Sequence, residues 1–502
     1  MDPEALQKEA EKKVAENPDK VLANIKKISL ISKLYFALLL LIGVAGVLFG
    51  FSILLHSGTV AAWVITIFGA MTFAIGRGIL YRPIKIEGYK LTENEATKNF
   101  FELIRDLEKK TNTKIHEVYI DESRGAGVLQ RPRFGFFGGY QNALILGLPF
   151  LFYVSTDQLK AILAHEFGHI SNNDGRDNSV GRSTRDSWIR VIQSMSTTWR
   201  AGYTAPLVLW YMKQAWPRLN AYAFAFNRFT EARADTFAEN YAHPESWVAG
   251  LLRVHILEHC WDEYGNAFVM DKQLMSNPNP TLHDDFRKMV KKPASEATLK
   301  YWINLATFRP EDPADTHPSL EKRLKAHGSE MSPTFLFSVA NKPLPDVAAD
   351  FVLGSDQDVV IKSIDDIAKT RINGIQQKTQ KAAEEAETVK SNFEEDLKQQ
   401  DLKTVYSAIN TTLSLEGATQ TKPYVEKLVE KKPDDVFGQY VLGKILLMEG
   451  DERGEAIYKK LLSERKANFN DIYIDLYRYY SKIGNRDKVN NLQNAMRGGV
   501  WV

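Results

Sequence analysis

The chain is poor in cysteine and carries almost no net charge. Its 502 residues include one cysteine, Cys260, so no disulfide can form within the chain, and a single thiol fits a reducing compartment. Lys and Arg number 64 and Asp and Glu number 62, which gives a formal net charge of +2. This balance predicts neither nucleic-acid binding nor an acidic tail. The length suggests two to four domains.

Two long stretches near the N-terminus have very few charged side chains. Leu34–Leu55 and Val60–Ile79 are apolar up to Arg77, and each is about long enough to span a bilayer. Only His56–Thr59 joins them, so the sequence predicts a transmembrane hairpin over residues 34–85. A cleaved signal peptide is not expected, because about 30 mostly polar residues precede the first stretch. A buried helical hairpin is the alternative interpretation.

Lysine and arginine flank both ends of this hairpin and are absent from its loop. Lys26, Lys27 and Lys33 precede it, and Arg82 and Lys85 follow it. The positive-inside rule therefore predicts that both ends face the cytoplasm. We expect an integral protein of the cell inner membrane, with a cytoplasmic N-terminal segment (1–33) and the rest of the chain on the same side.

A five-residue segment, His165-Glu-Phe-Gly-His169, is an HExxH sequence inside a helix-like run. Ser155–Gln158 opens that run as a capping box. Side chains four residues apart project from one helix face, so His165 and His169 can bind one zinc ion. Glu166 can then act as general base on a water at that metal.

A second helix-like run, predicted over Pro217–Tyr241, offers two carboxylates at the same spacing. Glu231 can complete a His2Glu site and leave a fourth position for water or substrate. Asp235 lies on the same face and can accept the free imidazole N–H of a ligand histidine. The alternative is a solvated helix face that pairs with Arg228 or Arg233.

A competing metal pattern follows in the next predicted helix, which runs from Pro244 to about Asp262. His255-Ile-Leu-Glu-His259 is an HxxEH, the inverted order of zinc-peptidase ligands. Both histidines continue an apolar stripe, and no second carboxylate helix accompanies them. We interpret His255 and His259 as partly buried packing residues.

The region before the HExxH helix predicts a small sheet. Glu117–Ile120 and Ala143–Leu148 are strand-like, and a helix is expected from residues 92–95 to about Lys110. Gly125–Tyr140 is either a lip over the cleft or a hairpin between strands. The fold class is therefore mainly α with a small β-sheet.

Three segments resemble the membrane zinc peptidase family that includes HtpX and the CAAX prenyl proteases. Residues 148–174 hold the HExxH and a trailing aspartate, residues 226–240 hold an ExxxD, and residues 316–324 hold a His-Pro-Ser followed by an arginine. The segments occur in the family's order, and the resemblance covers about 86–330. It implies an α+β gluzincin-type domain over this range.

The resemblance also implies zinc-dependent endopeptidase activity with one Zn²⁺ per chain. The ligands carried over are His165, His169 and Glu231, with Glu166 as base; Asp235 and Asp174 support the ligands, and His317 is a transition-state donor. For His317 the alternative is a turn residue before proline. The chain departs from HtpX at Trp188–Trp216, where spanning segments are expected but this sequence predicts an interfacial or soluble packing segment.

The C-terminal part differs in character from the rest. Residues 331–400 are predicted to include a charged helical linker, and residues 401–502 contain glycines at 417, 450 and 484, spaced by 33 and 34. An apolar helical run precedes each glycine. This period resembles tetratricopeptide repeats, which form an α-solenoid with a concave surface for a protein partner. A plain helical bundle is the alternative.

These observations predict a membrane-anchored zinc endopeptidase that cleaves proteins or peptides in quality control or processing at the membrane. The expected partners are a protein or peptide substrate, the bilayer and a protein at the repeats, but no nucleic acid. One alternative is a non-catalytic membrane adaptor with a structural zinc, which would not need Glu166. The other is a CAAX-type prenyl-peptide protease, which is expected to have more membrane spans.

Overall fold

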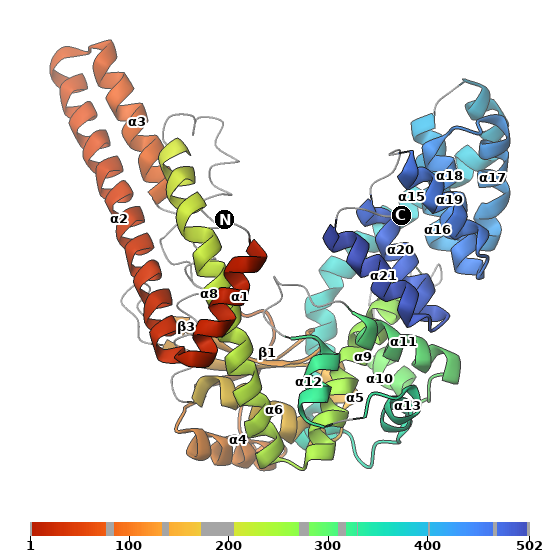
Figure 1. Cartoon of the computed structure of the whole chain (residues 1–502), viewed down its shortest axis with the longest axis horizontal. Coiled ribbons are helices and arrows are strands. Elements are labelled where there is room, and N and C mark those ends of the chain that lie inside the picture. Colours follow the sequence, from red (N-terminus) through yellow and green to blue (C-terminus); the bar gives the residue numbers. More distant parts are fainter. Residues whose placement is uncertain are drawn as a thin grey trace.

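The computed structural model describes residues 3–76, 85–132, 140–171, 205–270, 281–309, 318–328, 330–399, 402–464 and 469–498. In these ranges the chain is mainly helical with one four-stranded sheet, so the predicted fold class is confirmed. An N-terminal helical hairpin and a C-terminal array of helices rise from a central unit at its two sides (Figure 1).

The hairpin consists of α2 (Pro18–Ser57) and α3 (Val60–Gly76), after a short helix α1 (Pro3–Glu16). Gly58 ends α2 with φ of 58°. The two helices pack through glycines: a Cβ at Gly46 would lie 3.0 Å from the Cα of Gly69. Many large apolar side chains on the outer faces are exposed. The most apolar 18-residue stretch of α2 has a mean hydropathy of 2.7, so this helix is long and apolar enough to cross a membrane.

The sheet holds two predicted strands and two that the sequence did not show as strands. Its order is β1-β2-β4-β3, with β2 parallel to β4 and the outer strands antiparallel. Strand β3 therefore lies at an edge, and it forms with β4 the hairpin that was one interpretation of Gly125–Tyr140. The strands are β1 (Tyr89–Leu91), β2 (Glu117–Asp121), β3 (Ala126–Pro132) and β4 (Tyr140–Gly147).

Helices cover this sheet and enclose the main hydrophobic core. The helix expected from residues 92–95 begins only at Lys98, because Asn94 and Thr97 bind each other in a preceding turn. The strand predicted over Ala143–Leu148 was expected to lead directly into the HExxH helix, but a short helix, Leu148–Tyr153, lies between them. The elements are α4 (Lys98–Thr111), α5 (Leu148–Tyr153), α6 (Thr156–Ile170), α8 (Ala205–Tyr241), α9 (Pro244–Met270), α10 (Leu282–Val290), α11 (Glu296–Phe308), α12 (Leu320–Ala326), α13 (Pro333–Asn341) and α14 (Ala348–Leu353).

Helix α8 joins the hairpin to the central unit. It begins at Ala205 and runs through Pro217, so the predicted start at this proline was wrong. Packing compensates for the missing proline N–H: Tyr211 stacks on Tyr35 of α2 at 4.5 Å and lies 2.9 Å from the Ser32 hydroxyl. Of the predicted interfacial segment 188–216, only 205–216 lies in the described residues, and it packs beside α2.

The C-terminal helices form pairs, as the sequence predicts. Gly417, Gly450 and Gly484 have φ of 87°, 87° and 69°, and each turns the chain between two helices. Their identity as tetratricopeptide repeats stays a prediction. The helices are α15 (Gln357–Gln399), α16 (Leu402–Glu416), α17 (Ala418–Lys431), α18 (Val436–Glu449), α19 (Arg453–Ser463), α20 (Phe469–Lys482) and α21 (Arg486–Gly498).

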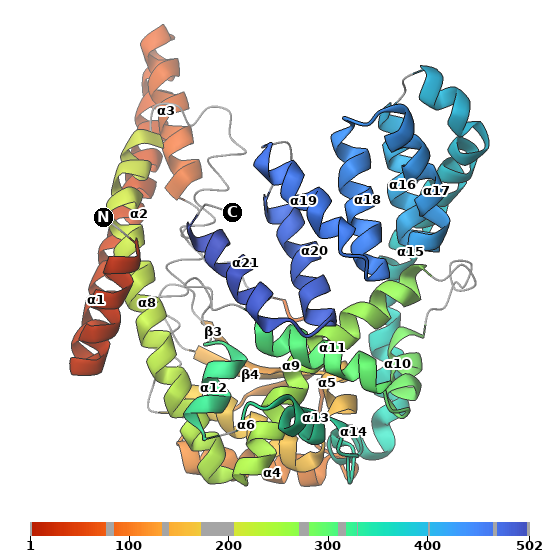
Figure 2. The same cartoon turned by 45° about the vertical axis from the view of Figure 1, so that its right-hand side comes forward.

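This array returns to the central unit at its far end (Figure 2). The Tyr477 hydroxyl donates to the Leu305 carbonyl at 2.6 Å, and the Gln493 amide donates to the Phe308 carbonyl at 2.7 Å. Arg486 forms an ion pair with Glu321 of α12. Helices α20 and α21 therefore brace α11 and α12. At the other end, α13, α14 and the start of α15 belong to the main core.

Candidate metal centre

Helix α6 holds the HExxH histidines on a rigid support. The predicted capping box is present: the Ser155 hydroxyl accepts from the Gln158 N–H at 3.3 Å, and the Gln158 side chain accepts from the Ser155 N–H at 3.1 Å. Most of the helix is buried in the main core. Gly168 lets α8 approach closely, since a Cβ there would lie 3.1 Å from the Cα of Ala234. This contact brings Glu231 to the histidines.

His165, His169 and Glu231 form a compact cluster, in which one ligand atom from each lies within 4.8 Å of the others. The Nε2 atoms of the two histidines are 3.0 Å apart. Glu231 Oε1 lies 3.2 Å from His169 Nε2, and Glu231 Oε2 lies 3.6 Å from His165 Nε2. No other such group of histidine, cysteine and acidic side chains occurs among the described residues.

The chemistry of these donors fits zinc. The Nδ1 of His165 lies 2.9 Å from Asp235 Oδ1, so a proton on Nδ1 would face the carboxylate and leave the Nε2 lone pair directed at the cluster. Two imidazole nitrogens and a carboxylate are the ligands of many catalytic zinc sites. Burial and the neighbouring His169 lower the pKa of His165, which favours the neutral ring that a metal requires.

His169 shows the opposite balance. Burial acts to lower its pKa, but the hydrogen bond and the charge of Glu231 outweigh burial and raise it. Without a cation, the carboxylate of Glu231 thus favours a proton on His169. A divalent cation would take the place of that proton between the two side chains.

Asp235 is the centre of a buried ionic network. Arg323 binds it with two hydrogen bonds, at 2.6 Å from Nη2 and 3.1 Å from Nε. His327 Nε2 lies 3.7 Å away, while its Nδ1 contacts Glu239 at 2.7 Å. Burial opposes ionisation of Asp235, but its contacts with His165, His327 and Arg323 hold its pKa far below the usual range.

The network replaces one of the ion pairs considered from the sequence. Arg228 pairs with Glu11 of α1 at 2.6 Å instead of with the α8 carboxylates. The sequence did not predict that Arg323 and His327 would contact Asp235. The one available signal was the arginine that follows His-Pro-Ser in the segment 316–324.

A cavity of about 300 Å³ opens beside the cluster. Trp247 forms one wall, with its ring stacked on His165 at 5.1 Å and the Arg323 guanidinium 5.4 Å from its centroid. Glu166 lines the same cavity. The other lining residues include Gly125 and Ala126 at the start of edge strand β3, His255 and Glu258 on α9, and Ser319 before α12.

The remaining predicted residues are placed as follows. His317 and Asp174 lie outside the described residues. His255 faces the cavity, and its Nδ1 contacts the Leu251 carbonyl at 2.8 Å. Neither His255 nor His259 belongs to the ligand cluster. The inverted pattern therefore brings no second set of ligands together among the described residues.

Comparison with known proteins identifies the surrounding domain. Residues 136–330 match peptidase family M48, a family of zinc metallopeptidases, and this range includes the ligand cluster, Asp235 and Arg323. Neither the curated proteins nor the solved structures contain a match to the chain. The chain thus carries a domain of peptidase family M48, to which HtpX and the CAAX proteases belong.

Proposed function

We propose that this protein is a membrane-anchored zinc endopeptidase with His165, His169 and Glu231 as metal ligands. The observation that carries the proposal is their convergence next to Glu166, in a cavity that an edge strand borders. Bound zinc would supply a Lewis acid that polarises a scissile carbonyl and makes water more acidic. Glu166 takes the proton of the attacking water and passes it to the leaving amine.

The surrounding residues keep this arrangement fixed. Asp235 accepts the Nδ1 proton of His165 and so orients the ring toward the cluster. Arg323 holds Asp235 ionised and in place through its two hydrogen bonds. We assign His317 the role of a donor to the developing oxyanion and Asp174 a supporting role near the ligands, on the family resemblance.

The substrate is proposed to bind as an added strand along β3. Among the described residues this strand pairs with β4 alone, and Ala126 at its start and the preceding Gly125 line the cavity with Glu166. Among the described residues outside the adjoining chain, no heavy atom lies within 4 Å of where a Cβ would stand at Gly125 or Gly127, so the surface of this strand is open there. Main-chain pairing holds an extended segment with little demand on its sequence. This supports a broad protein or peptide substrate, as quality control or processing requires.

The central test is Glu166→Gln. The variant should keep its zinc and lose about 10²–10⁴-fold in kcat/KM on an unstructured peptide, because the proton acceptor is gone. Glu258→Gln is the matched control, since Glu258 lines the same cavity but belongs to α9. It should stay within a few-fold of the wild type. Full activity in Glu166→Gln would remove Glu166 as the base, and a zinc-free chain that still cleaves would refute the mechanism.

Membrane anchoring is proposed through the α2–α3 hairpin, with both ends and the peptidase domain in the cytoplasm. The apolar outer faces and the flanking lysines and arginines support this orientation. A cysteine at Ser57 should react with an impermeant reagent added outside the cell, and one at Lys98 should not. The native Cys260 is buried and adds little background. The reverse pattern of labelling would contradict the proposed topology.

The C-terminal helices are proposed to bind a protein partner and to steady the cleft. Their contacts to Leu305 and Phe308 end beside Ala306 and Arg309, which line the catalytic cavity. Removal of residues after about 390 should therefore reduce cleavage of a protein substrate more than cleavage of a short peptide. Equal losses of cleavage rate on both substrates would mean that the C-terminal helices steady the cleft but do not bind a protein partner.

A further inference from the structure

A second cavity, of about 840 Å³, lies on the opposite face of α9 from the catalytic cavity. A helix turns by 100° per residue, which places the two sets of lining residues about half a turn apart. The catalytic set is Trp247, Leu251, Val254, His255 and Glu258. The second set is Arg253, Cys260, Glu263, Tyr264 and Ala267.

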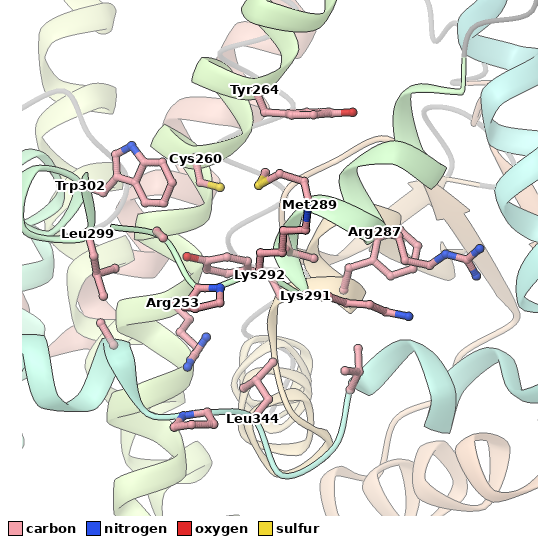
Figure 3. A pocket seen from close by; sticks show the side chains of 18 of the residues that line it. Arg253, Cys260, Tyr264, Arg287, Met289, Lys291, Lys292, Leu299, Trp302 and Leu344 are labelled. Carbon is pink, nitrogen blue, oxygen red and sulfur yellow. The ribbon is translucent and has the colours of Figure 1, made fainter. Parts of the chain in front are cut away.

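The walls of this cavity are mostly apolar and aromatic. Figure 3 shows Trp302 and Leu299 of α11 at one side, Met289 of α10 near the middle and Leu344 below them. Phe152 and Tyr153 of α5 also line the cavity. A cavity of this size with apolar walls is within the range that holds small-molecule ligands.

One charged side chain is buried in this apolar setting. Arg253 is 8% exposed and extends from α9 toward the segment that carries Leu344 (Figure 3). Its Nη2 donates to the Lys342 carbonyl at 2.5 Å, and the guanidinium lies 5.8 Å from the ring centroid of Tyr153. Its Nε is buried and has no hydrogen-bond partner among the described residues.

The two carboxylates that line the cavity bind other side chains. Glu263 accepts the indole N–H of Trp302 at 2.8 Å, and Asp350 accepts the Gln357 amide at 3.0 Å. No acidic side chain of the described residues lies within 4 Å of the Arg253 guanidinium. Burial of a cation without an opposite charge is unfavourable. The arginine therefore offers unused donors and an unbalanced charge.

The rim adds further positive charge. Lys291, Lys292 and Lys342 line the cavity and are exposed. Arg287 also lines it, but its charge is balanced by Asp284 at 2.5 Å and Asp358 at 2.9 Å. The exposed carboxylates of Glu263 and Asp350 offset part of this charge, but positive side chains still outnumber negative ones along the cavity. An anion would be drawn to the rim and bound inside.

We propose that this cavity binds a small organic anion, in which a carboxylate or phosphate group is carried on an apolar body. The anionic group contacts the Arg253 guanidinium, and the apolar body packs between Trp302, Tyr153 and Leu344. This site goes beyond the proposed peptidase function and does not depend on it. Its ligand contacts α9, the helix that also forms a wall of the catalytic cavity.

The test is calorimetric titration of the full chain, reconstituted in lipid nanodiscs, with water-soluble probes. 4-Phenylbutyrate and 4-phenylbutyl phosphate represent the two anionic groups, and 4-phenylbutanamide is the neutral analogue. One saturable site per chain is expected for at least one anion, with the amide bound at least about tenfold more weakly. Prior removal of zinc with a chelator excludes binding of the anion at the metal.

Two variants tie the binding to this cavity. Arg253→Met should weaken the anion at least about tenfold and leave the amide unchanged, because only the anion uses the guanidinium. Ala294→Trp fills the cavity from its rim and should abolish binding of all three probes. Arg105→Gln, at an exposed ion pair with Glu93, is the matched control and should bind as the wild type does.

Three results would overturn the proposal. The first is equal affinity for the anions and the amide. The second is an Arg253→Met variant that keeps its melting temperature and binds the anions unchanged. The third is binding only of an apolar tetrapeptide with a free C-terminus, which would assign the cavity to a chain end instead of a small anion.

Discussion

Two arginines at the two faces of α9 are nearly alike in burial and differ in their counter-charges. Arg323 is 7% exposed and Arg253 is 8% exposed, and each guanidinium lies within 6 Å of an aromatic ring centroid. Arg323 binds the carboxylate of Asp235 with two hydrogen bonds, whereas Arg253 donates a hydrogen bond to a neutral backbone carbonyl. Equal burial therefore does not mean an equal role: the paired arginine stabilises a site, and the other is placed to bind a charge from outside.

The largest expected effect separates these two arginines by their stability. Arg323→Met should lower the free energy of unfolding by about 3–5 kcal/mol, because it leaves the buried Asp235 without its main counter-charge. Arg253→Met loses one hydrogen bond to a carbonyl but removes an unbalanced charge, so its effect should stay within about 1 kcal/mol. Chemical denaturation of both variants measures the difference. Similar losses in the two would show that the counter-charge does not distinguish them.

The second effect concerns metal affinity. Asp235→Asn should weaken zinc binding by about 10–100-fold, since the amide is a poorer acceptor for the Nδ1 proton of His165. Competition with a chelator of known affinity measures this change. Glu239→Gln is the control, because Glu239 contacts His327 and no ligand histidine. Unchanged affinity in Asp235→Asn would return Asp235 to a purely structural role.

The smallest effect is a pH dependence of stability. The nearby carboxylates of Asp235 and Glu239 raise the pKa of His327 above its ordinary 6.5, although burial acts to lower it. Its contribution is therefore full below pH 6.5 and is lost as the pH rises through the raised pKa. We expect this contribution to be less than about 1 kcal/mol and to be absent in His327→Gln.

His259 provides the opposite slope as a control. Burial lowers its pKa, so its neutral form is favoured in the folded chain. Its contribution is full above pH 6.5 and is lost as the pH falls through the lowered pKa. Thermal unfolding between pH 5 and 8 should show His327→Gln and His259→Gln changing the profile in opposite directions. Changes of the same sign would contradict this assignment.

The sequence predicts the local part of this site and little of its surroundings. The HExxH turn, its capping box and the Glu231–Asp235 pair follow from spacing along single helices. The partners of Asp235 do not, since Arg323 lies 88 residues away and no local pattern relates the two. The burial of Arg253 without a counter-charge could not be predicted either, because it depends on packing against α5 and against the segment that carries Lys342.

The fold shows the same limit. Strands β2 and β4 have the apolar pattern of buried strands and were predicted, whereas β3 lies in a stretch rich in glycine and arginine that sequence alone left open. Helix α8 continues through Pro217 because contacts with α1 and α2 stabilise it, and such contacts outweigh a local helix-breaking signal. Element boundaries therefore depended on tertiary packing that spacing does not reveal.

The hydrogen bond between Tyr477 and Leu305 has a consequence for the order in which the nascent chain folds during synthesis. Its two residues are 172 positions apart in the chain. At about 5–20 residues per second, a ribosome needs roughly 10–35 s to travel that distance. During this interval α11 exists without its brace. The ligand histidines and Glu231 have already been synthesised, and Arg323 follows Leu305 by only 18 residues. A nascent chain thus completes its metal ligands well before the support of its cleft wall, and α20–α21 set the time at which that wall becomes rigid.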